Sequence, residues 1–447
     1  MPFAQHYAEH IAHLDSIYEA ALSASGAFDA VLLHSGSEHI YFADDQHPPF
    51  RANGHFNHWL PVNRPEQMVL VIPGERPVYF QVIPPDFWYE QHISLADWVL
   101  EQFNLVSLSS SREVSDKLAA LQVRKGLSLS RIAFIGENCT FASAIGITQE
   151  AQNPSNLVSH LDFHRACKTD YEIASIRKAN RLAMVGHTAA RKAFEAGGSE
   201  YEIHMAYLQA CEILEEETPY TNIVALDEKA AILHYQNKRR SSGEQSQVLL
   251  IDAGCRVNSY CSDITRTSTR EHTLPLFCDL VEAMESLQTH LVRSVRSGIP
   301  YPEIHSAAHE GITNILLGSG ICNGSRDSLL AEKVSTLFMP HGVGHLLGIQ
   351  VHDVGGRMKN IAGETLAPHS DYPNLRTTRM TEVGQVFTIE PGLYFIPVLL
   401  NPERGSTRGK LINWDLVETL SPLGGIRIED NVLVTDTGVE NLTRVSI

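Results

Sequence analysis

Three histidines and three glycines are concentrated in the stretch PHGVGHLLGIQVHD, which runs from Pro340 to Asp353. Glycine allows the backbone to approach a bound species closely, and histidine serves as a metal ligand and as a proton carrier near neutral pH. The stretch has almost none of the apolar periodicity of a helix or a strand. Its composition is that of a site, although in a chain with 22 histidines that interpretation needs further residues to support it.

Four carboxylates stand at or within predicted strands elsewhere in the sequence. Asp252 ends the apolar run 248–251, and Asp263 follows after a segment typical of a turn and a returning strand, so a hairpin can aim both side chains at one point. Glu390 and Glu429 interrupt the apolar patterns of two later strands. A carboxylate buried there without a partner would be unfavourable or would take up a proton, which implies a buried partner.

A divalent metal centre would supply that partner. The four carboxylates together with one neutral imidazole, that of His345, carry four negative charges, which two divalent cations balance. Oxygen-rich ligation with a single histidine favours Mn²⁺, Co²⁺ or Zn²⁺ over a thiolate-type site.

The elements that position these residues fall into two groups. The first is a mixed α/β domain that ends near a linker at 153–156, and a hairpin turn at 73–77 joins two of its strands. Its predicted helices are 4–25, 95–103 and 112–121, and its predicted strands are 30–33, 40–42, 68–72, 78–82 and 132–135.

The second group opens at Thr169 with a capping box, Thr-Asp-Tyr-Glu, followed by a long helix that Gly197 and Gly198 end. Its other predicted helices are 200–215, 273–297 and 302–317, and its predicted strands are 223–225, 231–234, 248–251, 386–395 and 425–434.

Composition narrows the class of protein. A chain of 447 residues with 43% hydrophobic residues can bury a large core and is expected to form two domains. A net charge of −17 argues against a nucleic-acid partner, and no apolar run is long enough to span a membrane. The polar first ten residues do not resemble a signal peptide, and the seven scattered cysteines include no CxxC pair. A cytoplasmic protein with reduced cysteines is predicted.

The phrases Asp-Ala-Gly at 252–254, His-Gly-Val-Gly-His at 341–345, Thr-Ile-Glu-Pro-Gly at 388–392 and Arg-Ile-Glu-Asp at 427–430 together resemble the dinuclear metallopeptidases of the pita-bread fold. Segments 44–50 and 55–61 are most similar to the bacterial prolidases, the Xaa-Pro dipeptidases, some of which also hydrolyse organophosphorus triesters and fluoridates. The resemblance implies an α/β chain with a creatinase-like N-terminal α/β domain at 1–157 and a pita-bread catalytic domain at 158–447.

The resemblance also implies roles for the metal ligands. Asp252 would chelate one metal ion, Asp263 and Glu429 would bridge two, and His345 and Glu390 would complete the other shell. The expected ions are two Mn²⁺, with Co²⁺ or Zn²⁺ as alternatives, and a hydroxide between them would attack the carbonyl before proline. Glu390 would act as general base and then acid.

Further residues would form the substrate side of the site. His341 and His352 would steady the oxyanion or the leaving nitrogen, and Arg376, Arg427 and His234 would bind the free carboxylate of an Xaa-Pro dipeptide. Tyr220, Leu233, Tyr301 and Val351 would shape the side-chain pockets. Asp45 and Trp88 of the N-terminal domain would reach the site of a neighbouring subunit, which predicts a homodimer.

Several of these residues have a structural alternative. His341 and His352 could be hydrogen-bonded structural histidines, and His234 a core histidine. Arg427 could pair with a neighbouring acid on its own strand, Arg376 could be solvated, and Trp88 could be a packing residue.

Other functions also stay open on the sequence. An aminopeptidase P-like enzyme would act on longer peptides, and a related hydrolase would act mainly on phosphotriesters with the same metals. Metal-free pita-bread domains also serve as binding modules and creatine hydrolases, but those lack the five ligands that are all present here.

Overall fold

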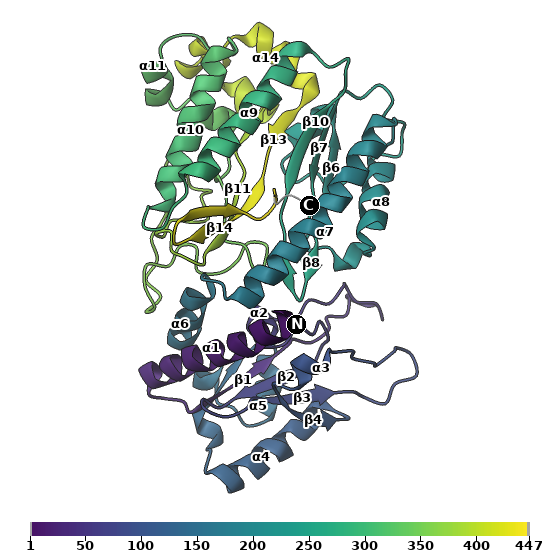
Figure 1. Ribbon diagram of the computed structural model, residues 1–447, viewed down its shortest axis with the longest axis vertical. Coiled ribbons are helices and arrows are strands. Elements are labelled where there is room, and N and C mark those ends of the chain that lie inside the picture. The colour runs from purple at the N-terminus through teal and green to yellow at the C-terminus, as the bar shows by residue number, and fades with distance from the viewer. Residues whose placement is uncertain (1, 445–447) are drawn as a thin grey trace. The chain divides into compact units, whose positions relative to one another are not determined.

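The computed structural model describes residues 2–444, which divide into two compact units (Figure 1). Unit 1 comprises the chain up to Arg165 together with Thr169–Ala174 and Met358–Thr365, and unit 2 comprises the rest. Residues 157 and 158, between which the sequence divides the chain, lie inside the helix α6 (Ser155–Arg165).

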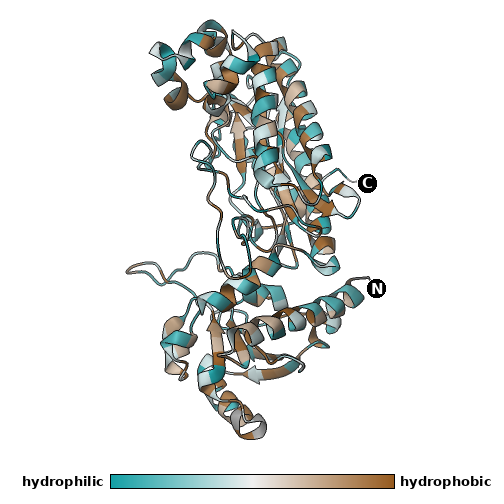
Figure 2. Ribbon diagram, turned by 90° about the vertical axis from the view of Figure 1, so that its left-hand side faces the viewer, coloured by the Kyte–Doolittle hydropathy of each residue, from teal (hydrophilic) through white to brown (hydrophobic). Residues whose placement is uncertain are grey.

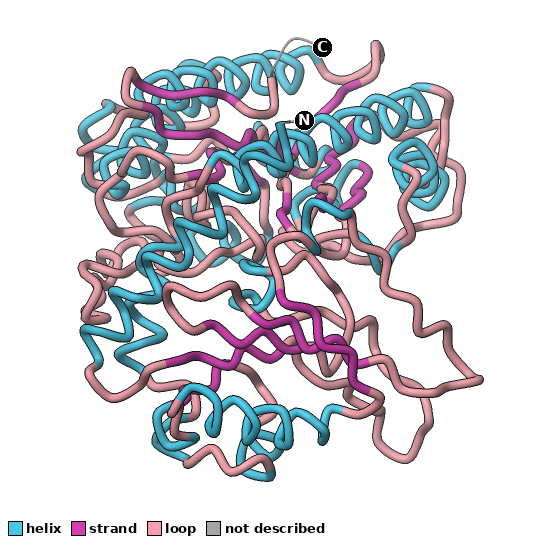
Figure 3. The backbone as a smooth tube through the Cα atoms, turned by 60° about the horizontal axis from the view of Figure 1, so that its bottom comes forward, coloured by secondary structure: helices cyan, strands magenta, loops and turns pink. Residues whose placement is uncertain are grey.

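Unit 1 is built on one twisted sheet of five strands in the order β4-β3-β2-β1-β5 (Figure 3). The antiparallel pairs are β1/β2 and β2/β3, and the parallel pairs are β1/β5 and β3/β4. The strands are predominantly hydrophobic (Figure 2), and their buried side chains form the core of the unit. Their bounds are β1 Ala30–His34, β2 Met68–Val71, β3 Val78–Val82, β4 Asn104–Leu108 and β5 Ile132–Ile135. The helices are α1 Pro2–Ser25, α2 Gly54–Trp59, α3 Asp97–Leu100, α4 Val114–Lys125, α5 Cys139–Ala144 and α6.

Three expectations for unit 1 were wrong in part. The predicted strand 40–42 is a loop in which the Phe42 side chain is fully exposed, because no strand pairs with it. The predicted helix 95–103 is reduced to the single turn α3, and β4 follows it at once. The predicted linker 153–156 is the start of α6, where Pro154 precedes the first helical residue, a position that proline tolerates.

Unit 2 has helices around two short antiparallel sheets, β10-β7-β6 and β11-β14-β15, with two further strand pairs, β12-β13 and β8-β9. The strands are β6 Ile223–Leu226, β7 Val248–Asp252, β8 Arg256–Val257, β9 Tyr260–Cys261, β10 Thr265–Thr269, β11 Val386–Ile389, β12 Gly392–Tyr394, β13 Gly425–Arg427, β14 Asp430–Thr435 and β15 Gly438–Asn441. The helices are α7 Asp170–Glu195, α8 Glu200–Cys211, α9 Pro275–Ser294, α10 Tyr301–Gly318, α11 Arg326–Ala331, α12 Ser335–Phe338, α13 Pro397–Leu400 and α14 Trp414–Leu420. The largest hydrophobic core lies in this unit, where buried residues of α9 and α10 pack with those of β11, β13 and β14.

Two expectations for unit 2 differ from the structure. Residues 231–234, a predicted strand, form the end of a 3₁₀ helix and a turn. The predicted strands 386–395 and 425–434 are each divided in two, and each break falls beside a glutamate, Glu390 in the first and Glu429 in the second. The acids therefore lie where the strands end.

No helix of residues 2–444 is long and apolar enough to cross a membrane. All seven cysteines are free, as predicted.

Candidate active site

Sheet pairing brings the four acids together from distant parts of the chain. Asp252, at the end of β7, pairs with Thr265 of β10, and Thr265 forms an isolated bridge with Glu429. Ile389 of β11 pairs with Asp430 of β14. Glu390 directly follows Ile389 and Glu429 directly precedes Asp430, so both glutamates lie next to this pair. The strand register therefore aims four carboxylates at one place.

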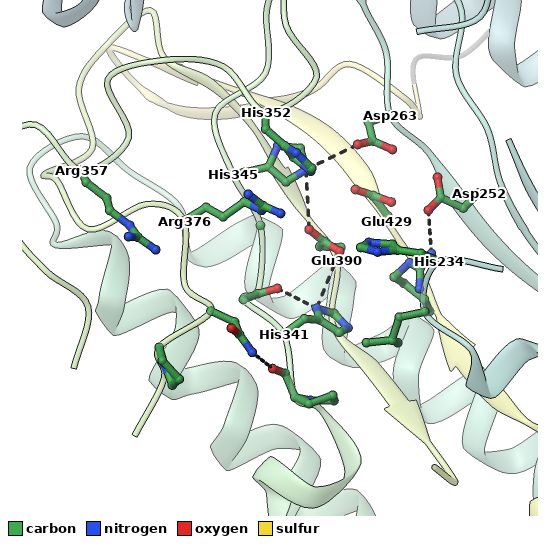
Figure 4. A pocket seen from close by; sticks show the side chains of 17 residues that line it. His234, Asp252, Asp263, His341, His345, His352, Arg357, Arg376, Glu390 and Glu429 are labelled. Atoms are coloured by element: carbon green, nitrogen blue, oxygen red, sulfur yellow. Dashed lines mark hydrogen bonds and ion pairs between the residues drawn. The ribbon is translucent and has the colours of Figure 1, made fainter. Parts of the chain in front are cut away.

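These acids line a cavity with a volume of about 480 Å³ (Figure 4). The other residues around it come mainly from the glycine-rich stretch and from the loop that precedes β11. They are Leu233, His234, Pro340, His341, Gly342, Gly344, His345, His352, Arg357, Pro373, Asn374, Arg376 and Arg427.

Asp263, His345 and Glu429 form the centre of the acid cluster. One ligand atom from each lies within 4.8 Å of the others, and all three residues are buried. His345 Nδ1 donates to the carbonyl of Leu346 at 3.1 Å, which directs Nε2 toward the acids. Nε2 lies 3.4 Å from Asp263 Oδ2 and 3.7 Å from Glu390 Oε1.

Tyr220 forms hydrogen bonds to both Asp252 and Asp263, and Arg427 pairs with Asp252. The Tyr220 hydroxyl lies 2.7 Å from Asp252 Oδ1 and 2.6 Å from Asp263 Oδ1. Arg427 Nη2 donates to Asp252 Oδ2 at 2.6 Å, and its Nη1 donates to the Tyr394 hydroxyl at 2.9 Å. Arg427 therefore pairs with an acid from another strand, and its guanidinium is committed to positioning Asp252.

The raised pKa values of three of the acids indicate an excess of negative charge in the cluster. Burial, together with Asp263, raises the pKa of Asp252 to about 6 against the opposing effect of Arg427. Burial raises the pKa of Glu390 to about 7, and burial with the neighbouring Asp263 and Glu390 raises the pKa of Glu429 well above its ordinary value. The pKa of Asp263, by contrast, is lowered overall, because the hydrogen bond and charge of His345 outweigh the effect of burial. Asp252, Glu390 and Glu429 therefore favour protonation unless cations neutralise the cluster.

This donor set fits divalent cations. It offers several carboxylate oxygens and one imidazole nitrogen around a cavity, the ligand types that Mn²⁺, Co²⁺ or Zn²⁺ accept. The described clusters of metal-ligand residues include two others, but His10-His58-Glu172 has a single acid, and both acids of His6-Glu9-Asp170 are exposed.

Gly344 allows the glycine-rich segment to lie against β11. A Cβ at this residue, whose φ is +157°, would meet the Thr388 carbonyl oxygen at 2.0 Å and the Tyr301 hydroxyl at 2.4 Å. The backbone nitrogen of Thr388 donates to the carbonyl of His345 at 3.0 Å, and that of Glu390 donates to Val343 at 2.8 Å. These bonds set the two metal-ligand segments side by side.

His341 and His352 both line the cavity as neutral rings. Burial, aided by Arg427, lowers the pKa of His341 to about 3, and burial, aided by His345, lowers that of His352 to about 4. His341 Nδ1 donates to the Gly342 carbonyl at 2.8 Å, so its Nε2 accepts from the Tyr394 hydroxyl at 2.9 Å.

The predicted substrate residues divide into those that line this cavity and those that do not. Leu233, His234 and Arg376 line it. Among the described residues around the cavity, Val351 and Tyr301 are absent, and Tyr301 is buried with its hydroxyl donating to Thr388 O at 3.1 Å.

Asp45 and Trp88 lie in unit 1. Both are exposed on loops; 77% of Trp88 is accessible, and its ring lies 4.7 Å from that of Phe87.

Three lining residues, Arg357, Pro373 and Asn374, were missed by the sequence reasoning. Arg357, Pro373 and Asn374 belong to the long irregular segment between the glycine-rich stretch and β11, and Pro340 begins that stretch. Asn374 Nδ2 donates to Pro340 O at 2.9 Å and so ties the segment to the site. No periodic pattern marks such a loop, although the spacing of Arg357 from His352 within one irregular run could have raised it as a candidate.

Comparison with known proteins agrees with this geometry. Residues 174–436 match the model of metallopeptidase family M24, and residues 5–163 match that of the Xaa-Pro dipeptidase N-terminal domain. The E. coli aminopeptidase P solved with the inhibitor Pro-Leu has a TM-score of 0.72 and 23% identity over 99% of this chain and 95% of its own. Proline aminopeptidase P II from Yersinia pestis has a TM-score of 0.71 and 24% identity over 99% and 96%. These structures show the fold, in which a pita-bread domain follows an α/β N-terminal domain along the chain, as predicted.

Closer relatives in sequence share the whole architecture. Xaa-Pro dipeptidase from Pseudoalteromonas atlantica is 42% identical over 99% of this chain and 98% of its own length. The enzymes of that name from Aeromonas hydrophila and Shewanella pealeana are 40% and 39% identical over equal shares. The chain belongs to metallopeptidase family M24.

Proposed function

We propose that this protein is a metal-dependent dipeptidase that hydrolyses the bond before proline in Xaa-Pro dipeptides. The observation that carries the proposal is one cavity that joins four acids and His345 to the guanidinium of Arg376, which forms no ion pair within residues 2–444. The full-length relatives named Xaa-Pro dipeptidase support the same substrate class.

The chain's own residues would divide the work as follows. Asp252, Asp263, His345, Glu390 and Glu429 would hold two divalent ions, which when bound lower the pKa of a water and polarise the substrate carbonyl. Glu390, beside His345 and His341, would accept the proton of the attacking water and return it to the proline nitrogen. An amide nitrogen leaves only once it is protonated, so this return is a required step.

The neutral histidines would act on the substrate side. His341 is held by Gly342 and Tyr394 in one orientation, and His352 lies with its ring 4.4 Å from that of His345. Both would contact the oxyanion or the leaving group. Arg376 and His234 would bind the terminal carboxylate, and Leu233 would contact the first residue of the dipeptide. Because Tyr220 and Arg427 form hydrogen bonds to the acids, they would position the metal ligands.

The test is release of the N-terminal alanine by metal-free protein reloaded with Mn²⁺, with Ala-Pro compared with Ala-Pro-Ala. Cleavage of the dipeptide at least about tenfold faster would support a site that selects a carboxylate directly after proline. Equal cleavage of both peptides would favour the aminopeptidase P-like alternative, and metal-independent or absent cleavage would refute the proposal.

Manganese is proposed as the metal because the donor set is oxygen-rich. Activity after reloading with Mn²⁺, Co²⁺ and Zn²⁺ in turn tests the choice of metal. The metal content measured per chain tests the number of two ions.

Organophosphorus triesters and fluoridates are proposed as slower substrates. Attack at a P=O group requires the same stabilisation by the metals and their acidic ligands as attack that forms a tetrahedral carbon centre. Fluoride release from a fluoridate, abolished by the same metal removal that abolishes proline release, is the expected result.

A homodimer is proposed from the exposed aromatic loops of unit 1. Phe42, Phe87 and Trp88 expose at least 77% of their surface, which is unfavourable in a monomer. Light scattering after size exclusion should give twice the chain mass, and replacement of Phe42 and Trp88 by serine should give a monomer. The same loops carry Asp45, whose place in a partner's site is tested by loss of activity on monomerisation.

A cytoplasmic location is proposed from the seven free cysteines, which would meet oxidants in an extracellular compartment. Fractionation of the source cells tests it.

A further inference from the structure

A second, smaller cavity of about 250 Å³ adjoins the first. His345, His352, Arg357 and Arg376 line both cavities. Leu346, Asp353 and Thr377 complete the smaller one, so its charged side chains are two arginines and one carboxylate.

That carboxylate is already neutralised. Asp353 Oδ2 accepts from Lys168 Nζ at 2.8 Å, and the two side chains are 1% and 0% exposed. The pair is tightly enclosed, since a Cβ on Gly348 would lie 2.1 Å from Asp353 Oδ2 and 2.9 Å from the Lys168 Cε. Asp353 is therefore not the counterion of the arginines.

The two arginines leave a surplus of positive charge at this end of the site. Among the described residues neither Arg357 nor Arg376 forms an ion pair, and both are exposed to the cavities. Two guanidinium groups on one cavity repel each other, and an anion between them would remove the repulsion and gain charge-assisted hydrogen bonds.

Arg357 is held in position by the chain segment that carries Arg376. Its Nη2 donates to the carbonyl of Leu375, the residue directly before Arg376, at 2.8 Å. One of its five N–H donors is used in this bond, and the guanidinium remains on the cavity wall. Figure 4 shows Arg376 between Arg357 and the acid cluster.

We propose that Arg357 is a second carboxylate-binding residue, so that the terminal carboxylate of the dipeptide lies between Arg376 and Arg357. This inference rests on the proposed dipeptidase function. A carboxylate has two oxygens and each can meet one guanidinium, which makes the free carboxylate of the substrate the group that Arg357 selects. Arg357 thereby determines the preference for a dipeptide acid over its amide.

The experiment measures kcat/KM for Ala-Pro and for its C-terminal amide with Mn²⁺-loaded wild type, Arg357→Gln and Arg376→Gln. Arg357→Gln is expected to lower kcat/KM for the acid about 10- to 100-fold, mainly through KM, and to change that for the amide by less than about 3-fold. Arg326→Gln, which removes an arginine exposed on α11, is the matched control and should leave both values unchanged.

Binding of L-proline to the metal-loaded protein gives a second readout that does not need turnover. Calorimetry should show Kd for proline raised about tenfold or more in Arg357→Gln and unchanged in Arg326→Gln. If wild type cleaves neither Ala-Pro nor its amide but this shift in Kd is present, the proposed function fails and the carboxylate site stands.

Three results would overturn the inference. An equal loss on acid and amide means that Arg357 only supports Leu375, and no loss on either means that it does not contact substrate. A loss confined to the amide would show that Arg357 does not act on the free carboxylate.

Discussion

Two clusters of histidine and carboxylate residues in this protein have similar distances between their ligand atoms but differ in their surroundings. In unit 1 the ligand atoms of His10, His58 and Glu172 lie within 4.8 Å of one another, and in unit 2 those of Asp263, His345 and Glu429 do the same. All six residues are buried. Proximity of metal-binding residue types therefore does not separate a metal site from a structural network.

The number of acids and the adjoining cavity separate the two. His10 Nδ1 lies 2.8 Å from Thr169 Oγ1 and its Nε2 lies 2.8 Å from His58 O, so both ring nitrogens have protein partners. Glu172 Oε2 accepts from the Thr169 backbone nitrogen at 2.9 Å, as the capping box of α7 predicts. In unit 2, by contrast, the acids outnumber their partners and face a cavity. An excess of unneutralised carboxylate beside open space is what marks a metal site.

The largest effect that tests this contrast is loss of the metal centre. Asp263→Asn should reduce proline release at least about 1,000-fold and lower the bound metal per chain, because a shared ligand is lost. The midpoint of thermal unfolding of the metal-free protein should stay close to that of wild type. A variant with full metal content and full activity would remove Asp263 from the ligand set.

The next effect concerns backbone packing in the two units. Gly344→Ala should lower activity about 100-fold and stability by about 1–3 kcal/mol, because its Cβ would meet a backbone oxygen at 2.0 Å. Gly54→Ala in unit 1 is the matched variant. There the nearest atom is the Arg165 guanidinium at 2.7 Å, the end of a side chain that can shift, so a change below about 1 kcal/mol is expected. Denaturant titration and proline release check both variants, and an equally stable Gly344→Ala would contradict the close approach.

A smaller effect is expected when the unit 1 cluster itself is changed. Glu172→Gln should lower the free energy of unfolding by about 1–2 kcal/mol, because the helix cap at Thr169 is weakened and the neighbouring His58 loses a charged partner. Bound metal per chain and kcat should not change. Loss of one metal equivalent in this variant would make the unit 1 cluster a metal site and erase the contrast.

The smallest effect is a dependence of stability on pH. Burial, opposed by Glu172 and aided by His58 and His13, lowers the pKa of His10 to about 4. Below pH 6.5 the unfolded chain binds a proton at this residue and the folded chain does not, so its contribution is intact above pH 6.5 and is lost as pH falls toward 4. The slope from this residue reaches at most about 1.4 kcal/mol per pH unit.

His10→Asn should make the unfolding free energy less steep in that range. The comparison uses the slope, because the substitution also removes hydrogen bonds at every pH. Denaturant titrations from pH 7.5 to 4.5 measure it, and an unchanged slope would mean that the folded protein protonates His10 normally.

Local pattern predicted the regular elements well. The start of α7 after Thr169, the helical periods of α9 and α10 and the apolar runs of β1, β2, β5 and β7 are all confirmed. Two of the predictions that failed were short apolar runs, 40–42 and 231–234, where no partner strand of the described residues lies alongside. A strand needs a neighbour to complete its hydrogen bonds, and a run of three or four residues carries no information about that neighbour.

The sequence alone predicted the acids at 252, 263, 390 and 429, the histidine at 345, the two-domain α/β organisation and the family. Each of these predictions depends on residue types and on short motifs of neighbouring residues. Tertiary structure decided how those residues are used. Arg427 holds Asp252, which is 175 residues away in sequence, and Arg357 shares a cavity with Arg376 because Leu375 anchors it. These pairings depend on strand register and on the packing of irregular loops, which bring together residues whose spacing along the chain has no period.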